Sequence, residues 1–546
     1  MQPESTGDLK AFALVNARVA LNESRAPNLG AGRPTAILIE DGRIAHVGDD
    51  DTVRDLLHRG QAIDVHGAVI APGFVDAHIH AFDCGVASLH VSCLPPEVDS
   101  LAALKRRLTD RAASRPRGAW VVGTGYDDTR LREHRHPSCL DLDSAVPHHP
   151  AVVGRACGHI SVANTLALTS AGIDRATPDP PGGTIVRDAT GAPTGLLLET
   201  AQDLVWRAIP PLSVPDIKSV LTQVGSQILS YGITTICEAL LGTSHPLELS
   251  IWSEVLSGQW EGPRVRFLAH PEIVEPALTA GLPVVGTKLF ADGVITGGTA
   301  ALSQAFEDTA DLGMLIHEPD ELTDMVRHSS ARGLTVGIHA MGDRGIATAL
   351  DAIQQGGQPV RPERAPERQV RHHRIEHCAL PSLESLSRMR KLGVIPVLQP
   401  VFLFAEGEAY LSQLGPQRCQ RAYPLRTMIE HRLRPALSSD APATTWDDPI
   451  NPWLGIAAAI ARRTWAGSVL GTTEAVSAEE AMLCYTANGA HALGLGNSAG
   501  TIARGKDADL IVLPQDPFVR DDPLKLAALR PAVVLVKGKV VHGAFA

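Results

Sequence analysis

Short apolar runs of strand type alternate with helical stretches through most of this 546-residue chain. A helix between two strands returns the chain to the start of the next parallel strand, so this alternation is typical of a parallel α/β fold. The sequence therefore predicts a parallel sheet with covering helices, either open or closed into a barrel. The strand-like runs lie at 69–75, 120–122, 234–236, 265–268, 287–290, 335–338, 374–375, 394–398 and 435–437, and the main helical stretches at 102–113, 219–231, 321–332, 347–355 and 478–493.

The two ends of the chain carry strand signals without helical periods. Asp41-Gly42 separates two apolar runs, and this pair suits the positive φ angles of a tight hairpin turn. Near the other end, the runs 532–536 and 540–541 form a second hairpin pattern. Because strand-rich ends can pair with each other, we expect them to build one small β-domain together.

The central part of the chain is longer than the ~250 residues of a bare (β/α)₈ barrel. The excess lies early, in a stretch rich in proline and glycine that includes Pro178-Asp-Pro-Pro-Gly-Gly183. We interpret this stretch as an inserted subdomain near the barrel mouth. The predicted divisions are 1–72 and 495–546 for the β-domain, 73–494 for the barrel and about 84–215 for the insertion.

Composition excludes several classes of protein. Hydrophobic residues make up 44% of the chain and charged residues 20%, as in ordinary globular proteins. No run approaches the ~18 apolar residues of a membrane span, and the net charge of −11 comes without a basic run suited to nucleic acid. The eight cysteines contain no CxxC pair and the first residues show no secretory pattern, so we expect a cytoplasmic protein.

The segment 72–80, Pro-Gly-Phe-Val-Asp-Ala-His-Ile-His, ends an apolar strand with two histidines. Alternate residues of a strand face the same side, so His78 and His80 would point into one cavity, as two imidazole ligands of a divalent metal do. A chance pair among 22 histidines is the competing explanation.

Other strand-like runs end in further candidate ligands. His339, His377 and Asp440 each end a strand-like segment, and Lys288 lies within an apolar one. Alone, a strand-end histidine is usually a hydrogen-bonded core residue, an aspartate caps the next helix, and a lysine pairs with a carboxylate. As a set they would converge at the carboxyl ends of barrel strands, where active sites of this architecture lie.

The ordered motifs resemble the amidohydrolase superfamily, and within it the YtcJ-like branch (amidohydrolase family 3) that includes N-substituted formamide deformylases. The resemblance implies a (β/α)₈ TIM barrel with a β-sandwich built from both chain ends. The motifs that carry it are PGFVDAHIH at 72–80, WVVGTGYDD at 120–128, GHISVANTLAL at 158–168, GGTIVRDATGAPTGLLLE at 182–199, YGITTI at 231–236, KLFADG at 288–293, HAMGDRG at 339–345, RIEHC at 374–378, SSDAP at 438–442 and GKDADLIVL at 505–513.

The resemblance also implies a binuclear centre of two divalent ions, with Zn²⁺ expected. By position, His78 and His80 would bind the more buried ion, and Lys288 would bridge both ions as a CO₂-derived carbamate. A buried ammonium next to metal ions would be repelled and desolvated, which favours this conversion. An ordinary ion pair between Lys288 and Asp292 is the alternative.

In the same resemblance, His339 and His377 would bind the second ion, and Asp440 would bind metal and act as the catalytic proton shuttle. His159 would contact substrate, or form only a structural hydrogen bond within the insertion. Asp292 and Asp343 are expected to fix loops.

Together with these residues, the resemblance implies a metal-dependent hydrolase in which a metal-bound hydroxide cleaves a non-peptide C–N bond, of amide or N-formyl type, in a small-molecule substrate. Hydrolysis of an ester, lactone or carbamate stays open. So does deamination, although Ala340-Met-Gly-Asp343 follows His339 where deaminases carry a glutamate. A non-catalytic binding or regulatory protein on the same barrel is the alternative from another class. We expect neither nucleic acid nor a membrane as a partner. A homodimer is expected only because dimers are the commonest oligomers of soluble proteins.

Overall fold

Eight parallel strands form the central sheet of the structure, which is a computed structural model describing residues 10–21, 34–58, 60–156, 160–243, 247–258, 260–357, 372–518 and 522–545. These strands are almost wholly buried, as expected for a parallel sheet covered by helices. In sheet order they are β7 (Phe74–Ile79), β14 (Ile233–Leu241), β15 (Arg264–Ala269), β16 (Val284–Phe290), β17 (Thr335–Ala340), β18 (Arg374–His377), β19 (Ile395–Leu398) and β20 (Ala436–Leu437).

Backbone hydrogen bonds draw the first and last strands of this sheet together. The Asp440 N–H donates to the His78 carbonyl and the His80 N–H donates to the Ala441 carbonyl, each at 2.9 Å. The sheet is therefore a nearly closed barrel, and the predicted (β/α)₈ fold is confirmed.

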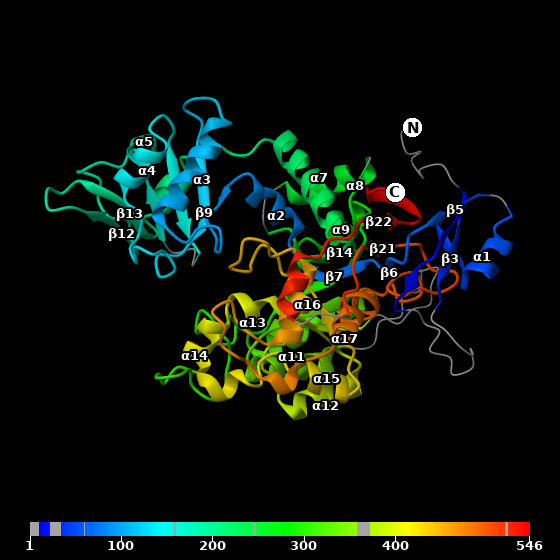
Figure 1. Cartoon of the computed structure of the whole chain (residues 1–546). Helices are drawn as coiled ribbons and strands as arrows, with labels where there is room; N and C mark the ends of the chain where they lie inside the picture. Colours follow the sequence, from blue (N-terminus) through cyan, green and yellow to red (C-terminus); the bar gives the residue numbers. More distant parts are fainter. Residues whose placement is uncertain are drawn as a thin grey trace. The chain divides into compact units, whose positions relative to one another are not determined.

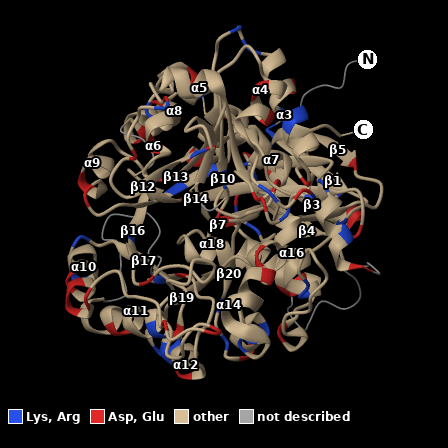
Figure 2. Ribbon diagram, turned by 90° about the vertical axis from the view of Figure 1, so that its left-hand side faces the viewer, with Lys and Arg blue, Asp and Glu red and all other residues tan. Residues whose placement is uncertain are grey.

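Helices cover the outside of the barrel, and Figure 2 shows three of them, α10, α11 and α12, outside β16, β17 and β19. In α11 the buried residues Ile346, Ala349, Leu350 and Ile353 recur at helical spacing and form its inner face. The covering helices include α7 (Val214–Ser230), α8 (Glu248–Ser257), α9 (Val274–Thr279), α10 (Pro319–Ala331), α11 (Asp343–Gly356), α12 (Leu383–Leu392), α13 (Val401–Ala405), α14 (Gly407–Cys419), α15 (Leu425–Glu430) and α16 (Pro452–Ala461).

The chain ends build two further sheets that share one core, as expected for a β-sandwich (Figure 1). Phe12 and Ile37 come from one sheet and Ile70, Val512 and Leu535 from the other. The first sheet has the order β4 (Arg43–Gly48), β3 (Ala36–Glu40), β1 (Ala11–Val15), β5 (Gln61–Asp64), and the second β2 (Arg18–Val19), β6 (Val69–Pro72), β21 (Leu510–Leu513), β22 (Val533–Val536), β23 (Lys539–Gly543).

The strand-like run 69–75 is divided between two sheets. Its first half is β6 of the sandwich and its second half begins β7 of the barrel. Gly73 joins them, and a Cβ atom there would lie 2.3 Å from the Thr234 hydroxyl oxygen, so only glycine fits. The chain passes directly from sandwich to barrel at this point.

By its internal contacts the chain divides into two units, and Phe82–Leu221 with Thr445–Pro449 form the second. The run 120–122 belongs to the sheet of this unit, not to the barrel, because β9 pairs with β8 and β10. Val121 and Val122 pack into separate clusters on opposite faces. The sheet order is β12 (Gly183–Arg187), β13 (Pro193–Glu199), β11 (Ile160–Ala163), β10 (Ala151–Arg155), β9 (Val121–Tyr126), β8 (Val91–Ser92), and the helices include α3 (Leu101–Ala113), α4 (Cys139–Ala145) and α5 (Thr165–Ser170).

The stretch 478–493, expected as one helix, is interrupted. It consists of α17 (Ala478–Leu483), the π-helical turn η3 (Cys484–Asn488) and α18 (Gly489–Ala492). Gly489 lies so close to β7 that a Cβ atom would approach the Val75 carbonyl oxygen to 2.8 Å. This tight packing against the barrel accompanies the change in helical pitch.

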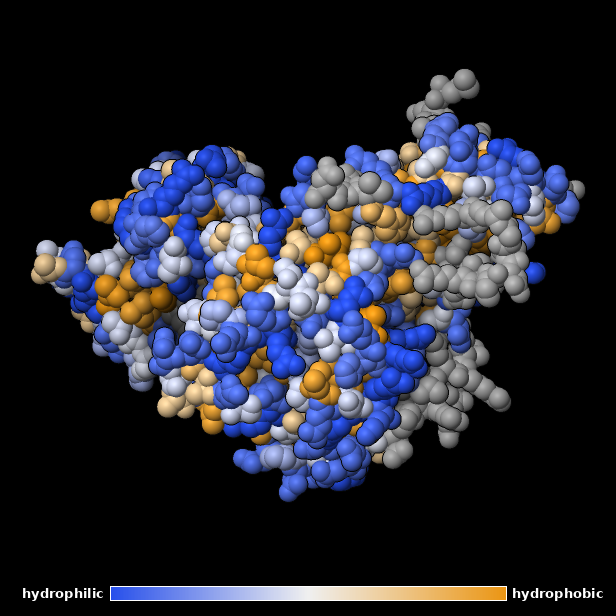
Figure 3. Space-filling model, turned by 60° about the horizontal axis from the view of Figure 1, so that its bottom comes forward, coloured by the Kyte–Doolittle hydropathy of each residue, from blue (hydrophilic) through white to orange (hydrophobic). Residues whose placement is uncertain are grey.

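Polar and apolar side chains are mixed over the face drawn in Figure 3. None of the helices in the described ranges is long and apolar enough to cross a membrane. The seven cysteines that the structure describes are buried free thiols.

Candidate metal centre

Three side chains meet where the barrel closes. His78 and His80 lie at the end of β7, and Asp440 follows β20. The Oδ1 atom of Asp440 lies 3.2 Å from His78 Nε2 and 3.1 Å from His80 Nε2. One ligand atom from each residue lies within 4.8 Å of the others, as ligands of one metal ion do. The predicted pair of histidines and the predicted aspartate are therefore brought together.

Two of these atoms are buried without a hydrogen-bond partner among the described residues, namely His78 Nε2 and Asp440 Oδ1. A buried polar atom without a partner is costly, and a divalent cation would satisfy both atoms at once. Burial raises the pKa of Asp440, but the His78 and His80 imidazoles outweigh it and hold the pKa well below its usual range. The donor set therefore fits a metal ion.

His339 and His377 lie beside this group. Their ring centroids are 4.3 Å apart, and the His377 ring lies 5.1 Å from that of His78. His377 Nδ1 contacts Gln399 Oε1 at 2.9 Å and His339 Nε2 contacts the Gly293 carbonyl at 3.0 Å, so each ring keeps its other nitrogen for a ligand. Burial lowers the pKa of both histidines, that of His339 to about 4, which favours the neutral imidazole that metals bind.

The backbone is strained at two of these residues. His377 has a φ angle of 68° and Asp440 one of 53°, both in the left-handed region. For a residue other than glycine this conformation costs about 1–3 kcal/mol, and such residues cluster at functional sites.

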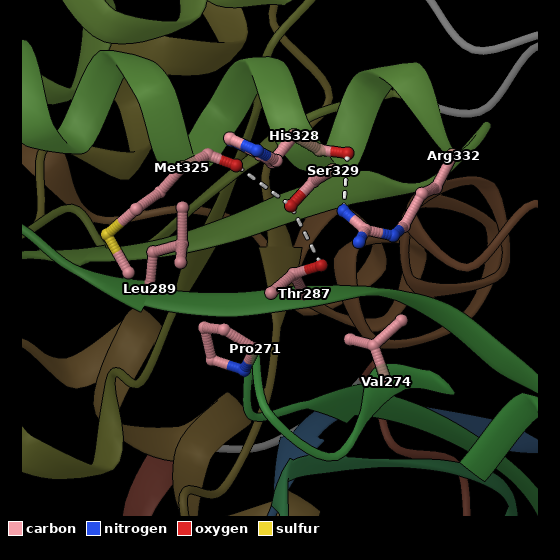
Figure 4. Close-up of a pocket in the computed structure, with 8 residues that line it drawn as sticks. All are labelled: Pro271, Val274, Thr287, Leu289, Met325, His328, Ser329 and Arg332. Atoms are coloured by element: carbon pink, nitrogen blue, oxygen red, sulfur yellow. Dashed lines mark hydrogen bonds between the residues drawn. The ribbon is translucent and has the colours of Figure 1, made fainter. Parts of the chain in front are cut away.

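Lys288 faces the inside of the barrel. Figure 4 shows the neighbouring Thr287 and Leu289 facing α10, where the Ser329 hydroxyl donates to that of Thr287 at 2.9 Å. Both residues line a cavity of about 220 Å³ on this outer side of the strand. Since adjacent strand residues face opposite sides, Lys288 points inward, where it is 2% exposed. Burial lowers its pKa, although the charges of Glu376 and Asp440 oppose this shift.

The alternative for Lys288, an ion pair with Asp292, does not occur among the described residues. The buried Asp292 carboxylate instead accepts backbone N–H groups of Ala301, Met341 and Gly342 at 2.8–2.9 Å. Asp343 accepts the Ser303 N–H at 2.9 Å. Both aspartates fix loops at this end of the barrel. His159 lies outside the described residues.

Glu376 is a site residue that sequence reasoning missed. Its carboxylate contacts His78 Nδ1 at 2.6 Å and accepts two hydrogen bonds from Arg374 at 2.7 and 2.8 Å, all fully buried. Burial raises the pKa of Glu376, but the Arg374 charge outweighs it and keeps the group ionised. With Nδ1 held by a carboxylate, His78 turns the lone pair of Nε2 towards Asp440. The sequence signal was the pair of opposite charges, Arg374 and Glu376, next to His377 in a short strand that proves to be fully buried.

Replacing this carboxylate, Glu376→Gln, should weaken metal affinity by about 10–100-fold, because His78 loses its orienting acceptor. The buried Arg374 charge also loses its partner, so the free energy of unfolding should fall by about 3 kcal/mol. Competition with a chromophoric chelator and urea unfolding measure the two effects. Glu275→Gln is the matched control, since its ion pair with Arg332 is exposed and should contribute under about 1 kcal/mol. Unchanged metal affinity would contradict the role of Glu376.

A protein-family model described as "Amidohydrolase family" matches residues 61–542, which include all of the barrel strands and the residues of the candidate centre. This chain belongs to the amidohydrolase family. The resemblance inferred from its motifs is confirmed.

Two relatives align with this amidohydrolase over most of their length. The YtcJ protein of Bacillus subtilis (strain 168), which is named as an amidohydrolase, is 31% identical over 93% of this chain and 96% of the relative. The N-substituted formamide deformylase of Arthrobacter pascens is 30% identical over 88% of this chain and 90% of that enzyme.

Among solved structures, an uncharacterized metal-dependent hydrolase from Pyrococcus furiosus superposes with a TM-score of 0.72 and 25% identity, covering 94% of this chain and 100% of that one. Family membership supports a hydrolase, and the His78, His80 and Asp440 group supports a metal-dependent one.

Proposed function

We propose that this amidohydrolase cleaves a non-peptide C–N bond of amide or N-formyl type in a small molecule. The observation that carries the proposal is the convergence of His78, His80 and Asp440, where His78 Nε2 and Asp440 Oδ1 are buried without a hydrogen-bond partner among the described residues. The similarity to an N-substituted formamide deformylase supports the choice of bond.

The proposed centre holds two divalent ions, Zn²⁺ by preference. His78 and His80 would hold the inner ion, and His339 and His377 would hold the outer one. A carbamate on Lys288 would bind both ions. Only a neutral amine reacts with CO₂, and the lowered pKa of Lys288 supports this modification. Bound ions supply a water of lowered pKa and a Lewis acid for the carbonyl oxygen.

The protein side chains then position and move the proton. Asp440 turns Oδ1 towards His78 and His80, so Oδ2 is the atom that would accept a proton from water and deliver it to the leaving nitrogen. The Phe402 ring lies parallel to that of His377 at 6.3 Å, and the Phe290 ring lies 5.5 Å from that of His339. These two aromatic rings would limit access of bulk water beside the outer histidines.

Metal content and hydrolysis test this proposal together. Protein purified without chelator should contain close to two ions per chain by plasma mass spectrometry. Dialysis against a chelator should lower hydrolysis of an N-substituted formamide by at least about 100-fold, and Zn²⁺ with bicarbonate should restore it. Full activity without metal, or no bound metal after Zn²⁺ and bicarbonate, would overturn the proposal.

A panel of substrates identifies the type of bond that the enzyme cleaves. N-substituted formamides, N-acyl amides, esters, lactones and aminated heterocycles are compared by kcat/KM on the same zinc-loaded preparation. The proposal predicts the highest values for formamides or amides. A clear preference for esters or lactones, or release of ammonia from the heterocycles, would replace it with one of the other hydrolytic reactions.

A further inference from the structure

A second polar cavity, of about 380 Å³, lies away from the metal centre. It is bordered by the stretch that joins α15 to β20, by the turn η3 with α18, and by the loop that follows α18. Among the residues that the structure describes, none that lines the cavity is acidic, and the polar ones are Arg434, Asn488, His491, Asn497, Thr501 and Lys506. Its volume falls within the ~300–1,000 Å³ of small-ligand sites.

This cavity lies at the amino-terminal ends of the barrel strands. The Asn488 side chain donates to the carbonyl of Pro435, the residue before β20, at 2.9 Å. Arg434 immediately precedes Pro435 in the chain. The candidate metal ligands His377 and Asp440 lie instead at or beyond the carboxyl ends of their strands. In barrels of this type catalysis takes place at the carboxyl ends, so the proposed mechanism uses none of these basic groups.

Basic side chains are concentrated in the cavity. Lys506 is only 7% exposed, and its Nζ atom donates to the Thr501 hydroxyl at 2.5 Å. The His491 and His372 rings lie 4.9 Å apart. Burial lowers the pKa of His491 to about 4, and the nearby charges that add to the shift, Arg434 and His372, are both basic.

The local backbone is also unusual. Ala487 and Asn488 line the cavity from the π-helical turn η3, which interrupts an otherwise α-helical segment. π-Helical turns are rare in proteins, and those that occur are often found at functional sites. They redirect side chains from the regular helical positions. Here the turn places the Asn488 amide at the border of the cavity.

We propose that this cavity binds a small oxyanion, a phosphate or a carboxylate group, between Arg434 and Lys506. The guanidinium of Arg434 supplies a planar pair of donors, Lys506 supplies a point charge, and Asn497 supplies a neutral amide donor. The proposal does not depend on the reaction at the metal centre, because no residue is shared between the two sites.

Isothermal calorimetry with inorganic phosphate on the zinc-loaded protein tests the site. Arg434→Gln and Lys506→Gln should each weaken phosphate binding by about tenfold or more, the usual effect of losing a charged hydrogen bond. Arg421→Gln removes the same charge from an exposed position elsewhere and should leave the affinity unchanged. The phosphate affinity should also be unchanged after a chelator has removed the metal, which separates this cavity from the metal centre.

A titration with acetate at constant ionic strength distinguishes the two classes of ligand. If acetate displaces phosphate, the site binds carboxylates, and if it does not, the site is specific for phosphate. Because Lys506 is buried, Lys506→Arg is included as the charge-conserving variant and should retain binding. Arg434 is exposed, so Arg434→Gln tests the site even if Lys506→Gln does not fold. Equal affinity in wild type, Arg434→Gln and Lys506→Gln, or no saturable binding at millimolar phosphate, would overturn the proposal.

Discussion

Replacing Asp440 with asparagine should lower kcat by about 10³-fold while most of the metal stays bound. Asparagine has the same shape and keeps an oxygen that can face His78 and His80, which lie 3.2 and 3.1 Å from Oδ1 in the native protein. Its amide nitrogen cannot accept a proton, so the transfer to the leaving nitrogen loses its carrier. General acid–base groups contribute about 10²–10⁴-fold. Turnover of an N-substituted formamide and metal per chain are the two measurements.

Asp343→Asn provides the comparison for this variant. It makes the same chemical change at the start of α11, where the native carboxylate contacts Ser303, and it should change kcat only a few-fold. Full activity of Asp440→Asn would exclude Asp440 as the proton carrier. Loss of metal together with activity would assign it a role in binding alone.

The second large effect is expected at Lys288. Lys288→Met keeps an apolar side chain of similar length inside the barrel but removes the amine that would carry the carbamate. Metal content should fall from two ions to one or fewer, and kcat by at least about 100-fold. Plasma mass spectrometry and turnover measure both quantities. In the native protein, ¹³C-bicarbonate should produce a carbamate signal in the carbon NMR spectrum that this variant lacks.

Two further observations make the Lys288 experiment decisive. Acetate or formate should partly restore the activity of Lys288→Met, because a free carboxylate can occupy the space left by the carbamate. Lys391→Met, which makes the same substitution at an exposed position of α12, should behave as wild type. Two bound ions and full activity in Lys288→Met would show that the lysine bridges nothing.

The barrel could be predicted from the sequence because its buried parallel strands are short apolar runs separated by helical periods. The same pattern could not assign β9 to its sheet, since Val121 and Val122 are as apolar as any barrel residue and only pairing with β8 and β10 distinguishes them. The apolar run 69–75 also does not show that the chain passes from one sheet to another at Gly73. The contact that requires glycine there is with Thr234, which is distant in sequence.

The sequence could predict those residues of the candidate site that lie at the ends of strands. His78, His80 and Asp440 were expected together and the structure brings them together, whereas the assignment of each ligand to an ion stays a prediction. Glu376 was missed because its position within a strand does not reveal its partner. Whether a buried carboxylate contacts an arginine, a histidine or both depends on neighbouring strands, which sequence spacing does not show.

The hydrogen bonds that close the barrel come from the candidate metal ligands themselves, between Asp440 and His78 and between His80 and Ala441. An ion held by these side chains would tie the first barrel strand to the last, across the whole intervening sequence. Loop-closure entropy grows with the length of the closed loop, so such a tie would act on the longest loop of the barrel. Metal affinity and barrel stability would then be linked quantities, each increasing the other. A cell that limits the metal would thereby limit the amount of folded enzyme as well as its activity.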